Sequence, residues 1–267
     1  LLQRMEAGFG VAEVDAIIQV VRCFEDKDII HVNGTVDPVR DMEIIKTELI
    51  LKDLDILSKH KIRVEKGAKA GDKKAQSVLA LLSRFESAFN EGRTAHQVSR
   101  TAEEKGLLKD VRFLTDKPIL YAANVAESEL GKPDSAHTAA VQKRAESEGY
   151  SMIKISGKVE EDISRLEPLE RAEFLEAMNM KESGLDQLAR EGYKVLNLIT
   201  FFTVGETENR AWTVEKNSTA PQAAGKIHSD FEKGFIRAEV ISYADFIQYR
   251  GEQGAKEHGR FRLEGKE

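Results

Sequence analysis

Apolar residues fall in two kinds of run along the chain, and each kind predicts a different element. A short continuous run at 15–24, rich in β-branched residues, predicts a buried strand. Similar runs predict strands at 119–123 and 152–155, with a helical stretch at 135–148 between them. Because strand, helix and strand follow one another, we expect a parallel α/β unit.

A long helical hairpin is predicted between the first and second strands. Apolar residues recur at helical spacing from 41 to about 65 and again from 75 to 89, and the glycine-containing segment 66–72 separates the two patterns. Two antiparallel helices are therefore expected at 41–112, as an insertion in an α/β domain.

The α/β domain around this insertion is expected at 1–40 and 113–195, with a helical stretch from about 167 to 195 at its end. Short β-rich segments separated by turns then predict a small α+β domain at 196–267. Its expected elements are strands at 198–204, 210–214 and 235–241 and one short helix near 221–231. This order suits a β-grasp fold, although periodicity does not distinguish it from other small folds.

Composition and charge narrow the class of protein. With 41% apolar and 32% charged residues, and no apolar run of membrane-spanning length, the sequence predicts a globular chain without a membrane span. The net charge of −6 argues against binding to nucleic acid by bulk charge, although a local basic surface is compatible with it. Cys23 is the single cysteine and no Cys/His cluster has zinc spacing, so we expect a buried thiol in a reducing, cytoplasmic protein without a metal site.

Four aromatic residues of the C-terminal part, Trp212, Phe231, Phe235 and Tyr243, are interpreted as core rather than as a surface for stacking nucleotides. Acidic residues nearly balance the basic ones in the same part, so a mixed, solvated surface is expected there. Charge alone therefore predicts no RNA-binding face in this domain.

The candidate chemistry lies at the ends of the two strands of the α/β unit, where open parallel sheets bind their ligands. Asn124-Val125-Ala126-Glu127 directly follows the strand at 119–123. A second Asn-x-x-Glu, at 179–182, follows no predicted strand, which favours the first copy. By themselves the four residues suit an ordinary polar loop equally well.

Asn124 and Glu127 suit a loop that reads a purine base. GTP-binding domains use Asn-Lys-x-Asp here, since the aspartate accepts hydrogen bonds from the ring N–H and the exocyclic amine of guanine. Adenine lacks those donors, whereas an asparagine amide can pair with its N7 and the neighbouring exocyclic group. The longer Glu127 spoils the fit to guanine, and an unpaired buried group costs roughly 1–3 kcal/mol, so ATP is expected to compete with GTP.

Ser156-Gly157-Lys158 follows the next predicted strand, where such domains place a second loop whose backbone contacts the base. Its position one α/β unit after Asn124 makes Ser156 and Gly157 candidates for base contact, although the residues alone also suit a plain turn. No Gly-x-x-x-x-Gly-Lys-Ser/Thr motif occurs, and Val159 follows Lys158. We therefore expect no phosphate loop, magnesium site or catalytic residue here, and no ATP hydrolysis by these residues alone.

Several longer segments carry a resemblance to one family. They are VDAI at 14–17, VRCF at 21–24, HVNGTVDP at 31–38, KP at 117–118 leading to Asn124, RAWT at 210–213 and APQAAGKIHSDFEKGFIRAEV at 220–240. The chain resembles the YchF-type, Obg-like ATPase family over essentially its whole length, although the stretch 1–12 matches it poorly.

The resemblance implies a P-loop NTPase-type parallel sheet, an inserted antiparallel helical hairpin and a C-terminal TGS domain of β-grasp fold. It implies ATP as the ligand, read by Asn124, the Val125 backbone and Glu127, with Mg²⁺ ligands in a preceding part of the protein. The phosphate loop and switch regions before Leu1, and the closing TGS strand after Glu267, would then lie outside this sequence. It also implies a cytoplasmic monomer that associates with ribosomes, with the large subunit as the expected partner, and that contacts RNA through the TGS domain.

Two functions of different classes are compatible with the sequence. The first is an ATPase that hydrolyses ATP in preference to GTP and couples ATP binding to ribosome association through the helical hairpin and the TGS domain, in translation or stress regulation. The second is a non-catalytic adaptor that binds RNA or protein through the TGS domain and the hairpin. The dependence of ribosome binding on the nucleotide state distinguishes them.

Overall fold

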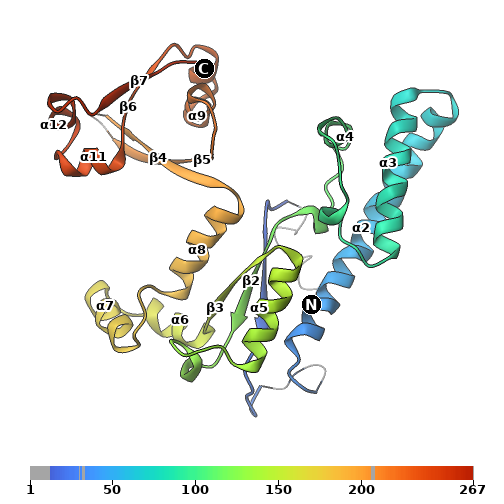
Figure 1. Ribbon diagram of the computed structural model, residues 1–267, viewed down its shortest axis with the longest axis horizontal. Coiled ribbons are helices and arrows are strands. Elements are labelled where there is room, and N and C mark those ends of the chain that lie inside the picture. The colour runs from blue at the N-terminus through green and yellow to red at the C-terminus, as the bar shows by residue number, and fades with distance from the viewer. Residues whose placement is uncertain (1–12, 30, 32–33, 206–207, 267) are drawn as a thin grey trace. The chain divides into compact units, whose positions relative to one another are not determined.

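The chain forms two compact units, Leu1–Val195 and Leu196–Glu267 (Figure 1). The computed structural model describes residues 13–29, 31, 34–205 and 208–266. Residues 1–12, at the start of the domain predicted at 1–40, lie outside the described residues. The fold class is α/β, as predicted.

Unit 1 is built on a three-stranded parallel sheet in the order β1 (Ile17–Arg22), β2 (Ile119–Asn124) and β3 (Ser151–Ile155) (Figure 1). All three predicted strands are confirmed. The central strand β2 is buried along its length up to Asn124, which explains its continuously apolar sequence. The register places Arg22, Asn124 and Ile155 side by side at the carboxyl ends of the strands.

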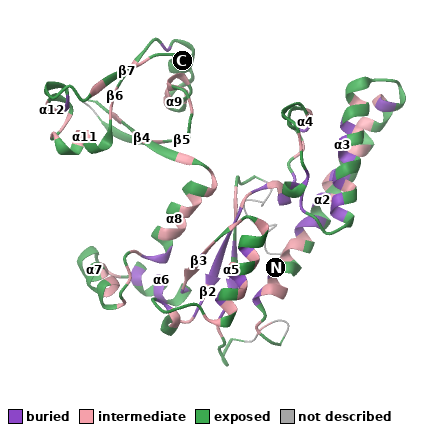
Figure 2. Cartoon of the chain, in the orientation of Figure 1, coloured by how far each residue is buried: buried purple, intermediate pink, exposed green. Residues whose placement is uncertain are grey.

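Helices cover both faces of the sheet at β2. One face packs against α2 (Pro38–Lys69) and α5 (Ala136–Glu148), and the other packs against α8 (Gly184–Val195). The first face joins Val21, Tyr121 and Ala123 of the strands to Met42 and Val141 of the helices. The second joins Leu120, Ala122 and Ile153 to Leu188 and Val195. Figure 2 shows the central strand β2 in the colour of buried residues, whereas most residues of β1 and β3 are intermediate or exposed, so β2 forms the centre of this core.

α2 and α3 (Lys73–Asn90) form the antiparallel hairpin predicted between β1 and β2. The helix expected at 41–65 is longer at both ends, since Asp37 caps α2 by accepting the Arg40 N–H at 3.1 Å. The turn is also shorter than the predicted 66–72, because α2 continues through Gly67 and closes only where Gly71 takes a φ of +89°. Asp72 then caps α3.

A buried carboxylate joins the hairpin to the segment before β2. Asp53 of α2 is 0% exposed and accepts hydrogen bonds from Leu114 N at 2.6 Å, Thr115 N at 2.9 Å and Thr115 Oγ1 at 2.7 Å. Burial raises the pKa of Asp53, and these three donors oppose that shift. The chain reaches this point from α3 through α4 (Ala102–Leu107), and the turn Leu114–Asp116 leads into β2.

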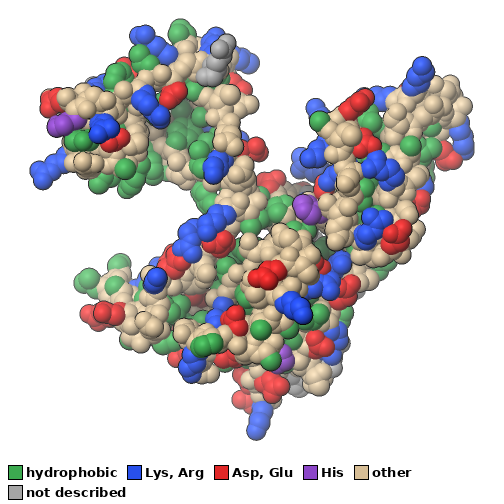
Figure 3. All heavy atoms as spheres, viewed as in Figure 1, with side chains coloured by type: hydrophobic (Ala, Val, Ile, Leu, Met, Phe, Trp, Pro, Cys, Tyr) green, Lys and Arg blue, Asp and Glu red, His purple; other side chains and the backbone are tan. Residues whose placement is uncertain are grey.

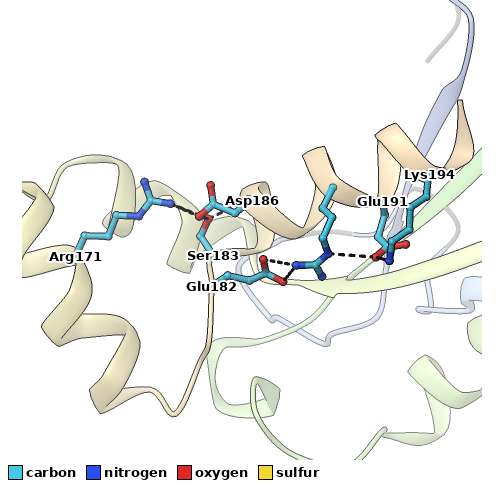
Figure 4. Close-up of polar contacts among 7 residues, drawn as sticks. Arg171, Glu182, Ser183, Asp186, Glu191 and Lys194 are labelled. Atoms are coloured by element: carbon cyan, nitrogen blue, oxygen red, sulfur yellow. Dashed lines mark hydrogen bonds and ion pairs between the residues drawn. The ribbon is translucent and has the colours of Figure 1, made fainter. Parts of the chain in front are cut away.

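Unit 1 ends in α6 (Gly157–Ser164), α7 (Pro168–Ala177) and α8. The single helical stretch predicted at 167–195 is wrong, because Asn179 takes a left-handed φ of +53° after α7. Ser183 begins α8 by accepting the Asp186 N–H at 3.1 Å, and Arg171 of α7 donates to Ser183 Oγ at 3.0 Å and pairs with Asp186 (Figure 4). Side chains thus fix the break between the two helices.

Unit 2 contains two antiparallel strand pairs, β4 (Leu198–Val204) with β5 (Asn209–Glu215) and β6 (Ala238–Ile241) with β7 (Phe261–Glu264). Its described residues also form the helices α9 (Ala220–Ile227), α10 (Ser229–Lys233), α11 (Tyr243–Gln248) and α12 (Glu252–Glu257). The prediction of one helix is therefore wrong, and the strand expected at 235–241 begins only at Ala238. α11 and α12 have six residues each, which is too short for a helical period to appear in the sequence.

The aromatic residues of unit 2 divide between interior and surface. Phe235 is buried, and Trp212 is half-buried with its Nε1–H donating to Thr203 Oγ1 at 3.0 Å. The prediction that all four are core is wrong for Phe231 and Tyr243, which are 56% and 66% exposed. Over the described part of the chain, no helix is long and apolar enough to cross a membrane.

Candidate functional site

The loops that follow β2 and β3 are joined by direct hydrogen bonds. Asn124 ends β2, and its Oδ1 accepts the Gly157 N–H at 2.9 Å. One residue later, Val125 N donates to the Ile155 carbonyl at 2.8 Å. Because Asn124 and Ile155 are already in register across the two strands, the loops meet within two residues of the strand ends.

Each of the two loops contains one buried residue and one residue that solvent can reach. Val125 and Ser156 are 2% and 1% exposed, whereas Asn124 is half-buried and Gly157 is exposed at the start of α6. The buried residues hold the backbone in place, and the Asn124 amide lies where a ligand can reach it. Of the five predicted site residues, Asn124, Val125, Ser156 and Gly157 therefore lie together.

The contact with Gly157 sets the orientation of the Asn124 amide. A backbone N–H only donates, so the amide must present its oxygen to Gly157. Its Nδ2 donor then has no hydrogen-bond partner among the residues that the structure describes. The loop thus offers a fixed amide donor at the carboxyl edge of the sheet.

Glu127 begins a 3-10 turn, Glu127–Glu129, and its side chain is 48% exposed. Its carboxylate lies 3.6 Å from Lys158 Nζ, which connects the two loops a second time. Lys158 was not among the predicted site residues. Its opposite charge on a loop predicted to lie beside Glu127 is the signal that points to this contact.

The second Asn-x-x-Glu segment has a different role. Asn179 supplies the left-handed residue that follows α7, and Glu182 forms an ion pair with Arg190 of α8 (Figure 4). The element directly before this segment is the helix α7, not a strand. The preceding element, rather than the Asn-x-x-Glu pattern, therefore distinguishes the two segments.

Glu160 supplies a further carboxylate beside the site, which the sequence did not predict. Glu160 of α6 is 7% exposed, and it accepts the N–H groups of Gly184 at 2.7 Å and Leu185 at 3.1 Å. These groups form the N-terminus of α8, where a carboxylate is stabilised by the helix dipole. A Cβ at Gly184 would lie 2.8 Å from Glu160 Oε1 and 2.9 Å from Ile155 Cγ2, so a larger residue would displace these side chains. No local sequence pattern predicts the hydrogen bond between Glu160 and Gly184, because these residues are 24 positions apart.

The described residues do not provide a metal centre. None of the described His, Cys, Asp and Glu side chains form a group of three or more that could hold a metal ion. Cys23 is buried, as predicted, at 1% exposure. Burial, with a smaller contribution from Glu129, raises the pKa of its thiol to about 12.

Parallel strands covered by helices on both faces, with polar loops joined at the carboxyl ends, define an α/β protein of the class that P-loop NTPases share. Similar proteins identify the family within this class. The chain is 48% identical over 258 residues to the protein named Ribosome-binding ATPase YchF of Escherichia coli O157:H7, with 97% of this chain and 70% of that protein covered. The corresponding Bacillus subtilis (strain 168) protein is 46% identical, with 96% and 70% covered. The chain belongs to the YchF family.

A solved structure and a family model agree with this assignment. The chain matches the structure described as that of the Schizosaccharomyces pombe YchF GTPase with a TM-score of 0.81 and 34% identity, covering 95% of this chain and 69% of that chain. Residues 198–267 match the family model YchF-GTPase_C, described as Protein of unknown function (DUF933). The names of these relatives include both ATPase and GTPase, so the names do not show whether the site prefers adenine or guanine.

Proposed function

We propose that this chain is the base-reading and ribosome-associating part of a cytoplasmic ATPase. The observation that carries the proposal is the hydrogen bond from Gly157 N to Asn124 Oδ1, which holds an amide donor at the edge of a nucleotide-binding type of sheet. Relatives named Ribosome-binding ATPase YchF support the ribosome as partner and ATP as ligand. We take the large subunit as the expected docking site and the protein as a monomer.

The geometry suggests how the loops would read adenine. The Asn124 Nδ2 donor suits N7 of a purine, which adenine and guanine share. Val125 N already donates to Ile155, so the Val125 carbonyl is the backbone group left to accept from the N6 amine of adenine. Guanine presents an acceptor, O6, at that position, and two acceptors repel each other. Ser156 and Gly157 would support the face of the base through their backbone.

The phosphates require residues that this sequence does not supply. It lacks a phosphate-loop motif, and the described residues form no metal-ligand cluster, so we assign no Mg²⁺ ligand or catalytic residue here. Mg²⁺, when bound with ATP, would neutralise phosphate charge. We propose that its ligands and the phosphate loop lie elsewhere in the protein. The exposed apolar side chains of β1, Ile18 at 48% and Val20 at 61%, are consistent with a further segment packing there.

We propose that unit 2 is a TGS domain of β-grasp type that contributes to RNA contact. Its two strand pairs and the helix α9 packed against β5 support this assignment, as does the match of residues 198–267 to the C-terminal family model.

The experiment compares nucleotide binding by the full-length protein and two variants. Asn124→Ala removes the amide and is expected to weaken ATP binding about tenfold, since one lost hydrogen bond is worth about 1 kcal/mol or slightly more. Asn179→Gly alters the second Asn-x-x-Glu copy, where glycine tolerates the φ of +53°, and is expected to bind ATP normally. Fluorescent-nucleotide titration measures both affinities. Equal affinities for Asn124→Ala and the unaltered protein would contradict the assignment.

The same preparations test the coupling to ribosomes. ATP turnover is measured with and without ribosomes, and co-sedimentation is compared in ATP and ADP. We expect ribosome binding to differ between the two nucleotides. Ribosome binding that ignores the nucleotide, with no turnover, would instead identify a non-catalytic adaptor.

A further inference from the structure

The outer end of the helical hairpin concentrates positive charge on an acidic chain. Residues 63–74, hereafter the hairpin tip, contain five cations and two carboxylates, whereas the whole chain has a net charge of −6. The cations are Arg63, Lys66, Lys69, Lys73 and Lys74, and all five are exposed. Lys and Arg side chains are visible at this end of the hairpin, at the upper right of Figure 3.

Few of these cations are neutralised within the protein. Lys69 pairs with Glu65 at 2.7 Å. The other tip carboxylate, Asp72, is occupied as the cap of α3, where it accepts the N–H groups of Lys74 and Ala75. Within the described ranges, the remaining tip cations have no carboxylate at ion-pair distance; they are Arg63, Lys66, Lys73 and Lys74.

Helix electrostatics explains only part of the cluster. Lys66 and Lys69 lie in the last turn of α2, where the helix dipole favours cations. Lys73 and Lys74 lie in the first turn of α3, where the dipole disfavours them, and that turn has no acidic residue. Asp72 at the N-cap already supplies the carboxylate that this helix end favours, so capping does not account for the two exposed lysines, and an anionic partner outside the chain would offset their repulsion from the dipole.

We propose that the hairpin tip binds the phosphate backbone of ribosomal RNA. The choice of ribosomal RNA rests on the proposed function, whereas the need for an anionic partner rests on the tip itself. The tip has no aromatic side chain for stacking on bases, so it suits contact with phosphates rather than reading of sequence. The exposed Ile62, at 73%, lies beside the cluster and adds an apolar contact.

The experiment removes charge at the tip and, separately, elsewhere. The tip variant of the full-length protein carries Arg63→Gln, Lys66→Gln and Lys73→Gln. The matched control carries Lys109→Gln, Lys143→Gln and Lys181→Gln, which are also exposed and have no ion pair among the described residues. Both variants change the net charge by the same amount. Circular dichroism and ATP affinity check that each one folds.

Binding to purified ribosomes, and separately to extracted ribosomal RNA, is measured across a range of KCl concentrations. Each phosphate contact contributes roughly 0.7–0.9 to the slope of log affinity against log salt. We expect the tip variant to lose about two units of slope and at least tenfold in affinity for both probes at low salt, and the control to lose little.

Two results overturn the proposal, and a third separates it from the proposed function. Unchanged binding by the tip variant, or equal losses in both variants, removes the tip as a specific contact. A loss with ribosomes but not with extracted RNA means that the tip binds a ribosomal protein. If the unaltered protein ignores ribosomes, the proposed function fails, and the RNA titration still decides whether the tip binds RNA phosphates.

Discussion

We propose that Glu127, through the length of its side chain, contributes to the choice between adenine and guanine. Its side chain is one methylene longer than the aspartate found in GTP-binding loops, and it leans toward Lys158 at 3.6 Å. An aspartate here would be too short to keep that pairing and would be free to accept from the guanine N–H groups. Under this proposal, side-chain length at position 127 shifts the base preference.

We expect Glu127→Asp to raise GTP affinity relative to ATP by about tenfold, as gain of one or two hydrogen bonds implies. Competition titration of both nucleotides against the full-length protein gives the ratio. Glu161→Asp serves as the control, since Glu161 is also an exposed glutamate that pairs with a cation, Arg165. An unchanged ATP-to-GTP ratio would refute the proposed role of Glu127.

Cys23 provides a pH-dependent prediction. Its pKa is raised to about 12 by burial, so at pH 8 only about one thiol in ten thousand is ionised, against roughly one in ten for an ordinary thiol. The folded state retains the proton more strongly than the unfolded state, so this group lowers stability as pH rises above its ordinary value of 9.0. Iodoacetamide labelling, followed by mass spectrometry, is expected to be about a thousandfold slower in folded than in urea-unfolded protein. Similar rates in both states would show that the thiol is accessible.

At the level of elements, α8 is held by a contact that begins in the candidate site. The loop containing Ser156 leads into α6, and Glu160 of α6 accepts two N–H groups from the start of α8. α8 then covers the sheet face formed by Leu120 and Ile153. Glu160 therefore links the helix that follows the Ser156 loop to the start of α8, in addition to the packing of α8 on the sheet.

Glu160→Gln is expected to destabilise the protein by about 1–2 kcal/mol, because an amide accepts less strongly than a carboxylate at a helix N-terminus and brings a donor against backbone N–H groups. Amide hydrogen exchange should accelerate at 184–186, and urea unfolding should shift. Glu161→Gln is the matched control, since Glu161 is exposed and pairs only with Arg165 on the same helix. Equal effects of the two substitutions would rule out a special role for Glu160.

Across the whole molecule, burial is distributed unevenly between the two units. In the described chain, the buried apolar residues of unit 2 are Val214, Phe235 and Ala255, whereas those of unit 1 form three clusters. Large apolar side chains such as Phe202 and Ile236 are exposed in unit 2. Unit 1 is therefore the stable framework for the base loop, and unit 2 has apolar surface to offer to other segments or partners.

Strands and the hairpin follow from local physical chemistry. The apolar runs of β1, β2 and β3 and the helical spacing in α2 and α3 are visible along the chain because each element is long or continuously buried. Sequence did not predict the short helices α11 and α12, because six residues are too few to show a helical period. It also did not predict the break at Asn179, because residue type alone does not determine φ. The same limit applies to the exposure of Tyr243, which depends on neighbours distant in sequence.

In the candidate site, too, some features follow from local sequence and others depend on contacts between distant residues. The amino-acid sequence by itself determined that Asn124 follows a buried strand and that Ser156-Gly157 follows the next one, because residue type and order are local properties. Three contacts form only in the folded chain: Gly157 N donates to Asn124 Oδ1, Lys158 lies beside Glu127, and Glu160 caps α8. These contacts join residues 24 to 33 positions apart, and parallel strand register, which no local pattern encodes, brings the first two together.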